Sequence, residues 1–486
     1  MERVSGNTEL GGISGNTELG GISSNLESED AFGNTEVEEW VEISGNTENQ
    51  DSTNEKEVRF QEAGVMRAVY KGKTRSVHDG LGLCSMGRKR AADRRQVDSP
   101  LGRRLRGVFW QELDGWLDNL GKKAELKLVA EVLCGRLQAS PFGGLPSRIA
   151  GAWAAVLKEA GLEADRREGD RDTLINFRLL QGLVEAFGDP DCGYLGKLAE
   201  EGVRLGVEGE VDRVAEVFEE KRRWNLPAVA SGEWEELLRD NYSSASKHME
   251  QVRSQLEKDL EKGDLIRMSL ADARKRYGAR LKVASLAAVP KDAEWNEVRV
   301  VHDASNGVEV NHRIRLSSQM RFPLFDDLEA VLHQFIKEAD VRKLMMAYDY
   351  KGAHRLVPIH EDDWGLQACR LDGEEEVLYL NTVGTFGVAS ALWWARVAAS
   401  IQRILWQILP ANDPLYKLLY ADDGLCLASG PRYKRVLLAV LLFITVLGAP
   451  LSWRKTRGGQ TVEWLGYTGS TYARGAWGLQ SGKWHG

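Results

Sequence analysis

The chain has 486 residues, of which 43% are hydrophobic, and its formal net charge is −8 at pH 7. This length has room for two or three domains. The five cysteines are scattered, with no CxxC pair and no zinc-ligand spacing, which argues against a disulfide-stabilised secreted domain and against a zinc centre.

Membrane and secretory classes are also disfavoured. Met1–Leu10 lacks the apolar segment of a secretory leader. The longest apolar run, Val436–Leu447, has 12 residues, which is too short to cross a bilayer and predicts a buried core helix. We therefore expect an intracellular protein of the cytoplasm, the nucleus or both, with no membrane partner.

Residues 1–66 are predicted to form a disordered, acidic, low-complexity segment. Ser5–Ile13 recurs at Ser14–Ile22, and partial copies follow. Residues 1–60 hold 14 acids and 3 bases, a net charge of −11, so the rest of the chain carries +3 (−8 minus −11). The few large apolar side chains of this segment cannot bury enough surface to offset the entropy of the chain.

Residues 67–107 are predicted to be a basic linker, because they hold 12 Lys or Arg against 3 Asp. Such a run suits nucleic-acid binding or nuclear import, and a solvated linker explains it equally well.

Residues 108–244 are predicted to be mainly helical, and their role is unknown. Apolar side chains recur at helical spacing around Trp110–Leu120, Leu126–Leu133, Leu174–Phe187 and Val211–Trp224.

The clearest chemical signal is Tyr420-Ala421-Asp422-Asp423, in which two adjacent carboxylates lie between the β-prone runs Leu415–Tyr420 and Leu425–Ala428. This pattern predicts a β-hairpin with both acids at its turn. Such a concentration of negative charge favours a bound cation, and Mg²⁺ takes carboxylate oxygens. A plain surface turn is the alternative, since the chain contains two further Asp-Asp pairs.

A third acid follows an apolar run upstream. Leu344–Asp349 predicts a buried strand that delivers Asp349 at its end. Gly352 and Ala353 come next, and they are small enough for backbone N–H groups to approach a phosphate. Helices are expected at 389–408, directly after Phe386-Gly387, and at 432–447.

In this order the segments resemble the palm of a retroelement reverse transcriptase, most of all those of long-terminal-repeat and DIRS-type retrotransposons. The resemblance covers 245–486, about half of the chain. It implies an α+β fold, a right-hand polymerase fingers and palm whose antiparallel palm sheet is backed by helices, preceded by a helical region and a disordered N-terminus. Leu286–Asp303 resembles the fingers hairpin, and His248–Met268 resembles the helix that leads into it.

The resemblance also implies roles for individual residues. Asp349, Asp422 and Asp423 would be the catalytic, metal-binding acids, with two Mg²⁺ ions (or Mn²⁺) as cofactors. Lys455 would protonate the leaving pyrophosphate, and a plain surface lysine is the alternative. The implied nucleotide-binding residues are Lys291, Arg299, Gly352, Ala353, His354, Phe386 and Gly387. The implied primer grip is Trp464, Leu465, Gly466 and Tyr467.

The function implied is RNA-directed DNA polymerisation, with a primed RNA or DNA template and dNTPs as partners. Two features depart from the family pattern. His354 stands where most reverse transcriptases carry Tyr or Phe against the ribose 2′-hydroxyl, and neither a thumb nor RNase H fits after Tyr467. The alternatives are therefore a non-catalytic nucleic-acid-binding remnant and, more distantly, an RNA-dependent RNA polymerase.

Overall fold

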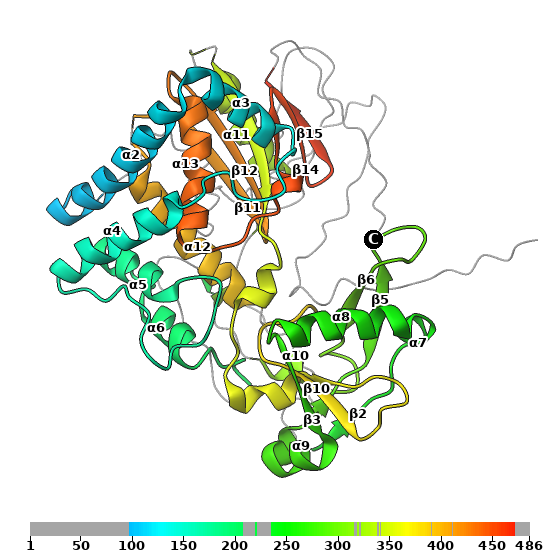
Figure 1. The fold of residues 1–486 in the computed structure, drawn as a ribbon. Helices are drawn as coiled ribbons and strands as arrows, with labels where there is room; N and C mark the ends of the chain where they lie inside the picture. Colours follow the sequence, from blue (N-terminus) through cyan, green and yellow to red (C-terminus); the bar gives the residue numbers. More distant parts are fainter. Residues whose placement is uncertain are drawn as a thin grey trace, which may run out of the picture. The chain divides into compact units, whose positions relative to one another are not determined.

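The computed structural model describes residues 97–207, 235–314, 322–337, 340, 342–389, 391–410 and 412–471, and the backbone alone at 219–220 and 318–319. By its contacts the chain divides into two units, Met1–Glu36 and Val37–Gly486, and every described residue belongs to the second unit. The expected disorder of residues 1–66, and residues 67–96 of the basic segment, lie outside the described residues. The described part combines helices and sheets, as expected for an α+β fold (Figure 1).

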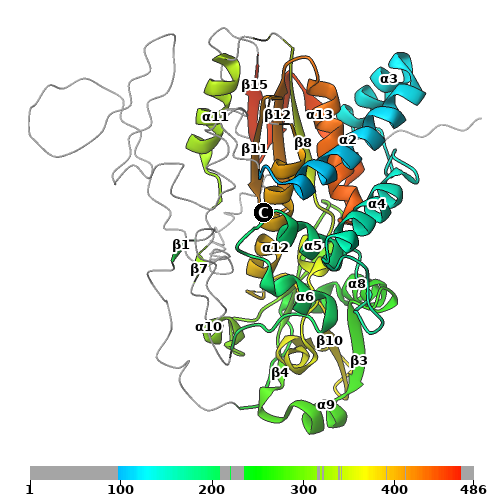
Figure 2. The same ribbon diagram turned by 90° about the vertical axis from the view of Figure 1, so that its left-hand side faces the viewer.

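A four-stranded antiparallel sheet carries the candidate site. Its strands, in spatial order, are β11 (Leu415–Tyr420), β12 (Asp423–Ser429), β8 (Lys343–Asp349) and β13 (Arg457–Gly459). One face is covered by α12 (Ala391–Ile408) and α13 (Tyr433–Val446). The other face is covered by α11 (Phe325–Lys337) and the hairpin of β14 (Thr461–Trp464) and β15 (Tyr467–Ser470) (Figure 2).

The sheet is buried on both faces, because side chains of β8 contribute to the hydrophobic cores above and below it. Strands in that position have no solvent face, which explains their unbroken apolar sequence. Beyond its first turn, helix α13 is almost entirely apolar and lies in the core, as its sequence predicts. None of the helices that the structure describes combines the length and apolarity needed to cross a bilayer.

A second, five-stranded sheet lies earlier in the chain. Its spatial order is β2 (Leu237–Leu238), β4 (Lys282–Val283), β9 (Ala368–Cys369), β10 (Val377–Asn381) and β3 (Leu265–Ser269). Beside it, β5 (Leu286–Pro290) and β6 (Val298–His302) form the antiparallel hairpin that the sequence predicts. This hairpin shares a core with α7 (Ser243–Lys247) and α8 (Met249–Glu261).

Several other described elements are short. They are β1 (Glu219–Glu220) paired with β7 (Ser318–Gln319), α9 (Leu270–Tyr277), α10 (Val310–Arg313) and four 3-10 helices, η4 (Gly278–Arg280), η5 (Ala353–Leu356), η6 (Glu361–Gln367) and η7 (Trp453–Lys455).

Five helices at the start of the described part pack against α12 and α13. They are α2 (Pro100–Leu120), α3 (Lys122–Leu133), α4 (Leu145–Glu159), α5 (Phe177–Ala186) and α6 (Gly193–Glu200). Phe443 of α13 meets Phe109 and Trp153 edge-on, with ring centroids 6.4 and 6.0 Å away. The Trp110 indole N–H donates to the carbonyl of Ile408 at 2.9 Å. The early helices therefore belong to the same hydrophobic core as the sheet.

Buried ion pairs join α12 to the turn before α6. The Arg396 guanidinium donates to both carboxylate oxygens of Asp191, at 2.6 to 3.1 Å, and lies 4.5 Å from the ring centre of Tyr194. Arg403 pairs with Asp189 about two turns further along the helix. Two buried charges are tolerated in such a place because each satisfies the other.

Two expected boundaries and one expected helix are wrong. The basic linker does not reach residue 107, because α2 begins at Pro100. The Ser99 hydroxyl caps this helix by accepting from the Gly102 N–H at 2.9 Å, and Pro100 suits its first turn. Of the basic side chains on this turn, Arg103 pairs with Asp98 and Arg104 with Glu159, so they are engaged within the chain.

The helix expected over His248–Met268 ends at Glu261, and β3 follows it. Gly263 separates the two elements with a φ of 78°, a left-handed conformation that favours glycine. The helix expected over Val211–Trp224 is also wrong at Glu219–Glu220, which pair with Ser318–Gln319 as a strand. The other residues of that segment lie outside the described ones.

We predict that Arg396→Ala lowers the free energy of unfolding by about 3–5 kcal/mol, because it leaves the buried Asp191 carboxylate without its partner. Urea denaturation followed by circular dichroism measures this. Arg103→Ala removes an arginine from an exposed pair and should cost less than about 1 kcal/mol. Equal losses for the two variants would contradict the structural role of the buried pair.

Candidate active site

The three predicted acids meet at one end of the four-stranded sheet. Asp349 is the last residue of β8, and in the antiparallel register it lies opposite Asp423, the first residue of β12. Asp422 belongs to the turn between β11 and β12, and its carbonyl accepts the Tyr350 N–H at 3.0 Å. Strand pairing thus brings together acids that are separated along the chain.

The turn that carries Asp422 is tight and strained. It has two residues, Ala421 and Asp422, and Ala421 has a φ of 49°, which a residue with a side chain rarely adopts. The Trp394 indole of α12 donates to the Ala421 carbonyl at 3.1 Å and holds the turn. Strain of this kind persists where the surrounding structure fixes it, and such positions concentrate at functional sites.

Burial and mutual repulsion raise the pKa values of two of these acids. The pKa of Asp423 is raised to about 6, first by burial and then by the charges of Asp422 and Asp349, and Lys455 opposes the shift. The pKa of Asp422 is also raised by burial and by Asp349. The site therefore disfavours its own negative charges, and a cation bound between them would relieve both causes.

Asp349 is already engaged by two residues around η7. The Lys455 ammonium donates to Asp349 Oδ2 at 2.8 Å, and the Ser452 hydroxyl donates to Oδ1 at 2.5 Å. The Ser452 N–H also donates to the Asp349 carbonyl at 2.8 Å. In this arrangement, no group of three or more His, Cys, Asp or Glu side chains within the described residues is set to hold a metal ion. Three carboxylates on rigid strand ends are nevertheless the donor type that fits Mg²⁺.

Several of the predicted nucleotide-binding residues lie together beside the acids. The Arg299 guanidinium lies 5.4 Å from the ring centre of Phe386, and His354 meets the same ring edge-on at 6.1 Å. The charge of Arg299 also acts on Asp422, whose pKa it lowers slightly against the larger effect of burial. Gly352, in a left-handed conformation, precedes the turn of η5 that contains Ala353 and His354.

Lys291 is not brought to the acids by any contact in the described residues. It lies just after β5 and pairs with Glu297 across the turn of its hairpin at 3.7 Å.

The residues of the predicted primer grip also make no contact with the three acids within the described part of the chain. Leu465 and Gly466 form the turn between β14 and β15, and both have positive φ. Trp464 is buried in the core under α11, and Tyr467 packs on Phe325.

The sequence did not indicate which side chain holds the Phe386-Gly387 turn. The Asn311 side chain donates to the Gly387 carbonyl at 2.8 Å and accepts from the Ala389 N–H at 2.9 Å. Gly387 has a φ of 98°, and a Cβ there would lie 2.0 Å from the His302 carbonyl oxygen. Only glycine fits this position. Asn311 was visible as a polar residue in the sequence, but no local pattern links it to the turn.

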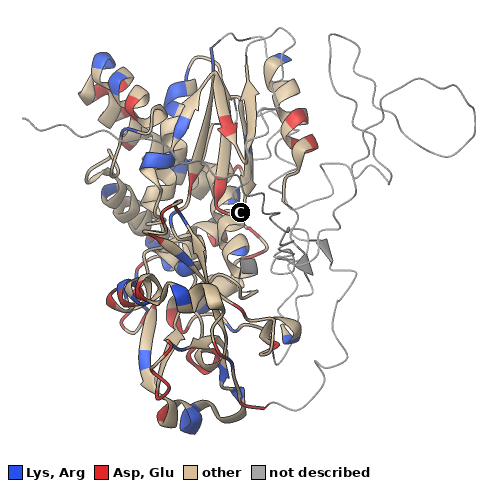
Figure 3. Ribbon diagram, turned by 90° about the vertical axis from the view of Figure 1, so that its right-hand side faces the viewer, with Lys and Arg blue, Asp and Glu red and all other residues tan. Residues whose placement is uncertain are grey.

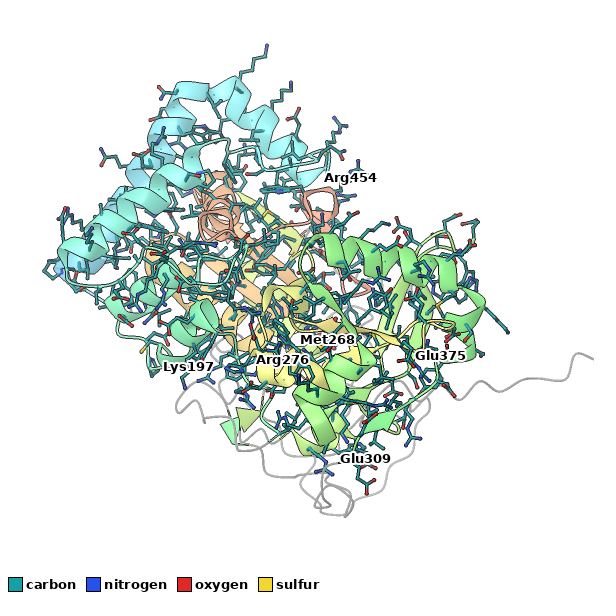
Figure 4. The ribbon with its side chains drawn as sticks, turned by 60° about the horizontal axis from the view of Figure 1, so that its bottom comes forward. Lys197, Met268, Arg276, Glu309, Glu375 and Arg454 are labelled. Carbon is teal, nitrogen blue, oxygen red and sulfur yellow. The ribbon has the colours of Figure 1, made fainter. Side chains whose placement is uncertain are left out.

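The early helices also support the segment that carries Ser452 and Lys455. Trp453, between those two residues, meets Phe142 edge-on with ring centroids 6.1 Å apart. Arg454 donates to the Gln138 side chain in the loop after α3, and Figure 4 shows Arg454 beside this loop. The region of unknown role thus touches the segment that contacts Asp349.

No protein-family model matches the sequence, and no curated protein matches it. Among solved structures, the foamy viral protease–reverse transcriptase in complex with double-stranded DNA is similar at 15% identity with a TM-score of 0.37, covering 58% of this chain and 43% of that chain. Native prototype foamy virus protease–reverse transcriptase is similar at 18% identity and a TM-score of 0.36, covering 54% and 30%.

The foamy viral enzyme in complex with an RNA/DNA hybrid gives 17% identity and a TM-score of 0.36, covering 54% of this chain and 31% of that chain. The chain thus spans less than half the length of the proteins it matches. Similarity of this size does not establish a shared fold, and the function proposed below rests on the geometry of the site.

We predict that His302 makes the protein less stable in acid. Its ring is buried and neither ring nitrogen has a hydrogen-bond partner, and burial lowers its pKa from 6.5 to about 4, with Asp303 opposing and Arg355 assisting. The unfolded chain therefore takes up the proton first as the pH falls. The stabilising contribution is complete above pH 6.5 and is lost as the pH falls toward 4.

The comparison of wild type with His302→Leu isolates this contribution, because leucine cannot titrate and His354, whose pKa is also lowered to about 4 by burial, remains in both proteins. Between pH 6.5 and 4 the wild type should lose about 3 kcal/mol more than the variant. Urea midpoints at each pH provide the measurement. Parallel pH profiles would show that folding does not lower the pKa of His302.

Proposed function

We propose that the chain is an RNA-directed DNA polymerase, a nucleotidyltransferase that adds dNTPs to a primer on an RNA or DNA template. The single observation that carries this proposal is the register of β8 and β12, which sets Asp349 opposite Asp423 with Asp422 in the adjoining turn. In this proposal the four-stranded sheet is the palm and the hairpin of β5 and β6 belongs to the fingers.

The proposed reaction is a phosphoryl transfer. The primer 3′-hydroxyl loses its proton and forms a bond to the α-phosphorus of the dNTP, while the bond to pyrophosphate breaks. Two Mg²⁺ ions, when bound, would lower the pKa of the attacking hydroxyl and neutralise charge on the phosphates. Asp349, Asp422 and Asp423 would hold these ions, because their carboxylates lie at one sheet end, and the raised pKa values of Asp422 and Asp423 favour a bound cation.

Other residues of the site would orient the nucleotide. Arg299 lies over Phe386, where its exposed guanidinium can reach a triphosphate. We expect backbone N–H groups of Gly352 and Ala353 to contact a phosphate. Lys455 is the expected proton donor to the leaving pyrophosphate. Figure 3 shows acidic and basic positions mixed over the helices, so the template would meet local basic groups in place of one uniformly positive face.

We predict that Asp422→Asn reduces nucleotide addition by at least about 100-fold, because phosphoryl transfer depends on positioned charge. The assay is primer extension on an RNA template with Mg²⁺ or Mn²⁺. Asp362→Asn is the matched control, since Asp362 also belongs to an Asp-Asp pair but contacts the exposed Arg204 instead. It should retain activity. Equal activity of Asp422→Asn and wild type would exclude the proposed site.

The choice of nucleotides in the same assay separates the competing functions. Extension with dNTPs supports the proposal, whereas extension with rNTPs alone would identify an RNA-dependent RNA polymerase. Salt-sensitive binding of the primed template without any extension by the wild type would instead identify a non-catalytic nucleic-acid-binding protein.

We predict that His354→Tyr increases the preference for dNTP over rNTP. The His354 imidazole lies at the edge of Phe386 with its Nδ1 buried and without a hydrogen-bond partner, so a larger ring would fill the space near a ribose 2′-hydroxyl. Relative kcat/KM values for a matched dNTP and rNTP measure the change. An unchanged ratio would show that His354 does not contact the sugar.

A further inference from the structure

The pairing of Lys455 with Asp349 has a consequence for metal binding. Both carboxylate oxygens of Asp349 have a donor, the ammonium at 2.8 Å and the Ser452 hydroxyl at 2.5 Å. Lys455 and Asp349 differ in how far their side chains are exposed. The Asp349 side chain is 11% exposed at the end of a central strand, whereas the Lys455 side chain is 68% exposed. The acid is therefore fixed, and the lysine is the partner that can leave.

We propose that Lys455 is the resident counter-ion of Asp349 in the free protein and competes with divalent cations for that carboxylate. This inference rests on the proposed function, because it assumes that Asp349 is a metal ligand. An ammonium and a divalent cation at the same carboxylate repel each other, so metal binding at Asp349 favours the departure of Lys455. The lysine stem is long and flexible enough to swing outward when this happens.

The displaced ammonium would then be free for a second partner. A triphosphate next to the site presents oxygens to which a lysine can donate. If a bound nucleotide pairs with Lys455, the lysine no longer competes with the metal for Asp349, and the affinity for the metal rises. By linkage, bound metal raises the affinity for the nucleotide by the same factor. Lys455 would in this way couple the two binding events and keep Asp349 neutralised until both ligands are present.

The test is a titration of the full chain with Mn²⁺ alone, followed by electron paramagnetic resonance of the free ion, with no nucleic acid and no turnover. Lys455→Gln should bind Mn²⁺ about tenfold more tightly than wild type, because the lost interaction is a charge-assisted hydrogen bond. Lys455→Arg keeps the charge and should resemble wild type.

Lys351→Gln is the matched control. Lys351 is an exposed lysine two residues after Asp349. Its backbone N–H donates to the Pro450 carbonyl at 3.0 Å, and within the described residues its side chain has no ion pair. The same charge is thus removed close to the acids without freeing the carboxylate. Tightening by less than about threefold is expected for this variant, from long-range charge alone. Equal tightening by Lys351→Gln and Lys455→Gln would overturn the inference.

Asp349→Asn distinguishes this failure from a failure of the proposed function. If wild type and Asp349→Asn bind Mn²⁺ identically, Asp349 is not a metal ligand, and both proposals fall. If Asp349→Asn weakens binding while Lys455→Gln leaves it unchanged, the metal site stands and the counter-ion role is refuted. Addition of a dNTP should tighten Mn²⁺ binding more in wild type than in Lys455→Gln, since only wild type has a competitor to remove.

Discussion

The pairing of β8 with its two neighbours is the constraint on which the rest of the structure depends. β8 bonds to β12 on one side and to β13 on the other, so one strand sets the positions of all three acids and of the segment that carries Lys455. A shift of one residue in its register would exchange the faces of Met345 and Met346, which belong to different cores. Packing on both faces therefore fixes the chemistry at the strand end.

The electrostatics of the site follow from the same arrangement. Three carboxylates at the end of a buried sheet repel one another. Lys455 and Ser452 donate to Asp349, and the charge of Arg299 favours the ionised form of Asp422. These groups do not fully offset the repulsion, because the pKa values of Asp422 and Asp423 remain raised. A site that remains short of positive charge is suited to binding more of it.

Much of this core was predictable from sequence, because its signals are local. An unbroken apolar run ending in Asp349, an acidic turn between two β-prone runs and the apolar helix after it all appear in short windows, and the strands and helices are found there. The contacts that complete the site were not predictable. Ser452 meets Asp349 across 103 residues, and Asn311 meets Gly387 across 76. The start of α2 at Pro100 was not predicted, because the basic composition of residues 67–107 indicated a linker. The local signal for a helix start was Ser99 followed by Pro100.

The packing of the early helices on the late ones bears on how the chain is made. Asp114 of α2 bonds to Arg435 of α13 across 321 residues, and at synthesis rates of about 5–20 residues per second the second partner follows the first by roughly 15–60 s. A helix forms in about a microsecond, so α2 and α4 can form well before their partners are made, and until then Phe109 and Trp153 lack their contact with Phe443. The newly made chain therefore spends this interval with the apolar side chains of its early helices not yet covered by the late helices. This is the period in which chaperones are most needed.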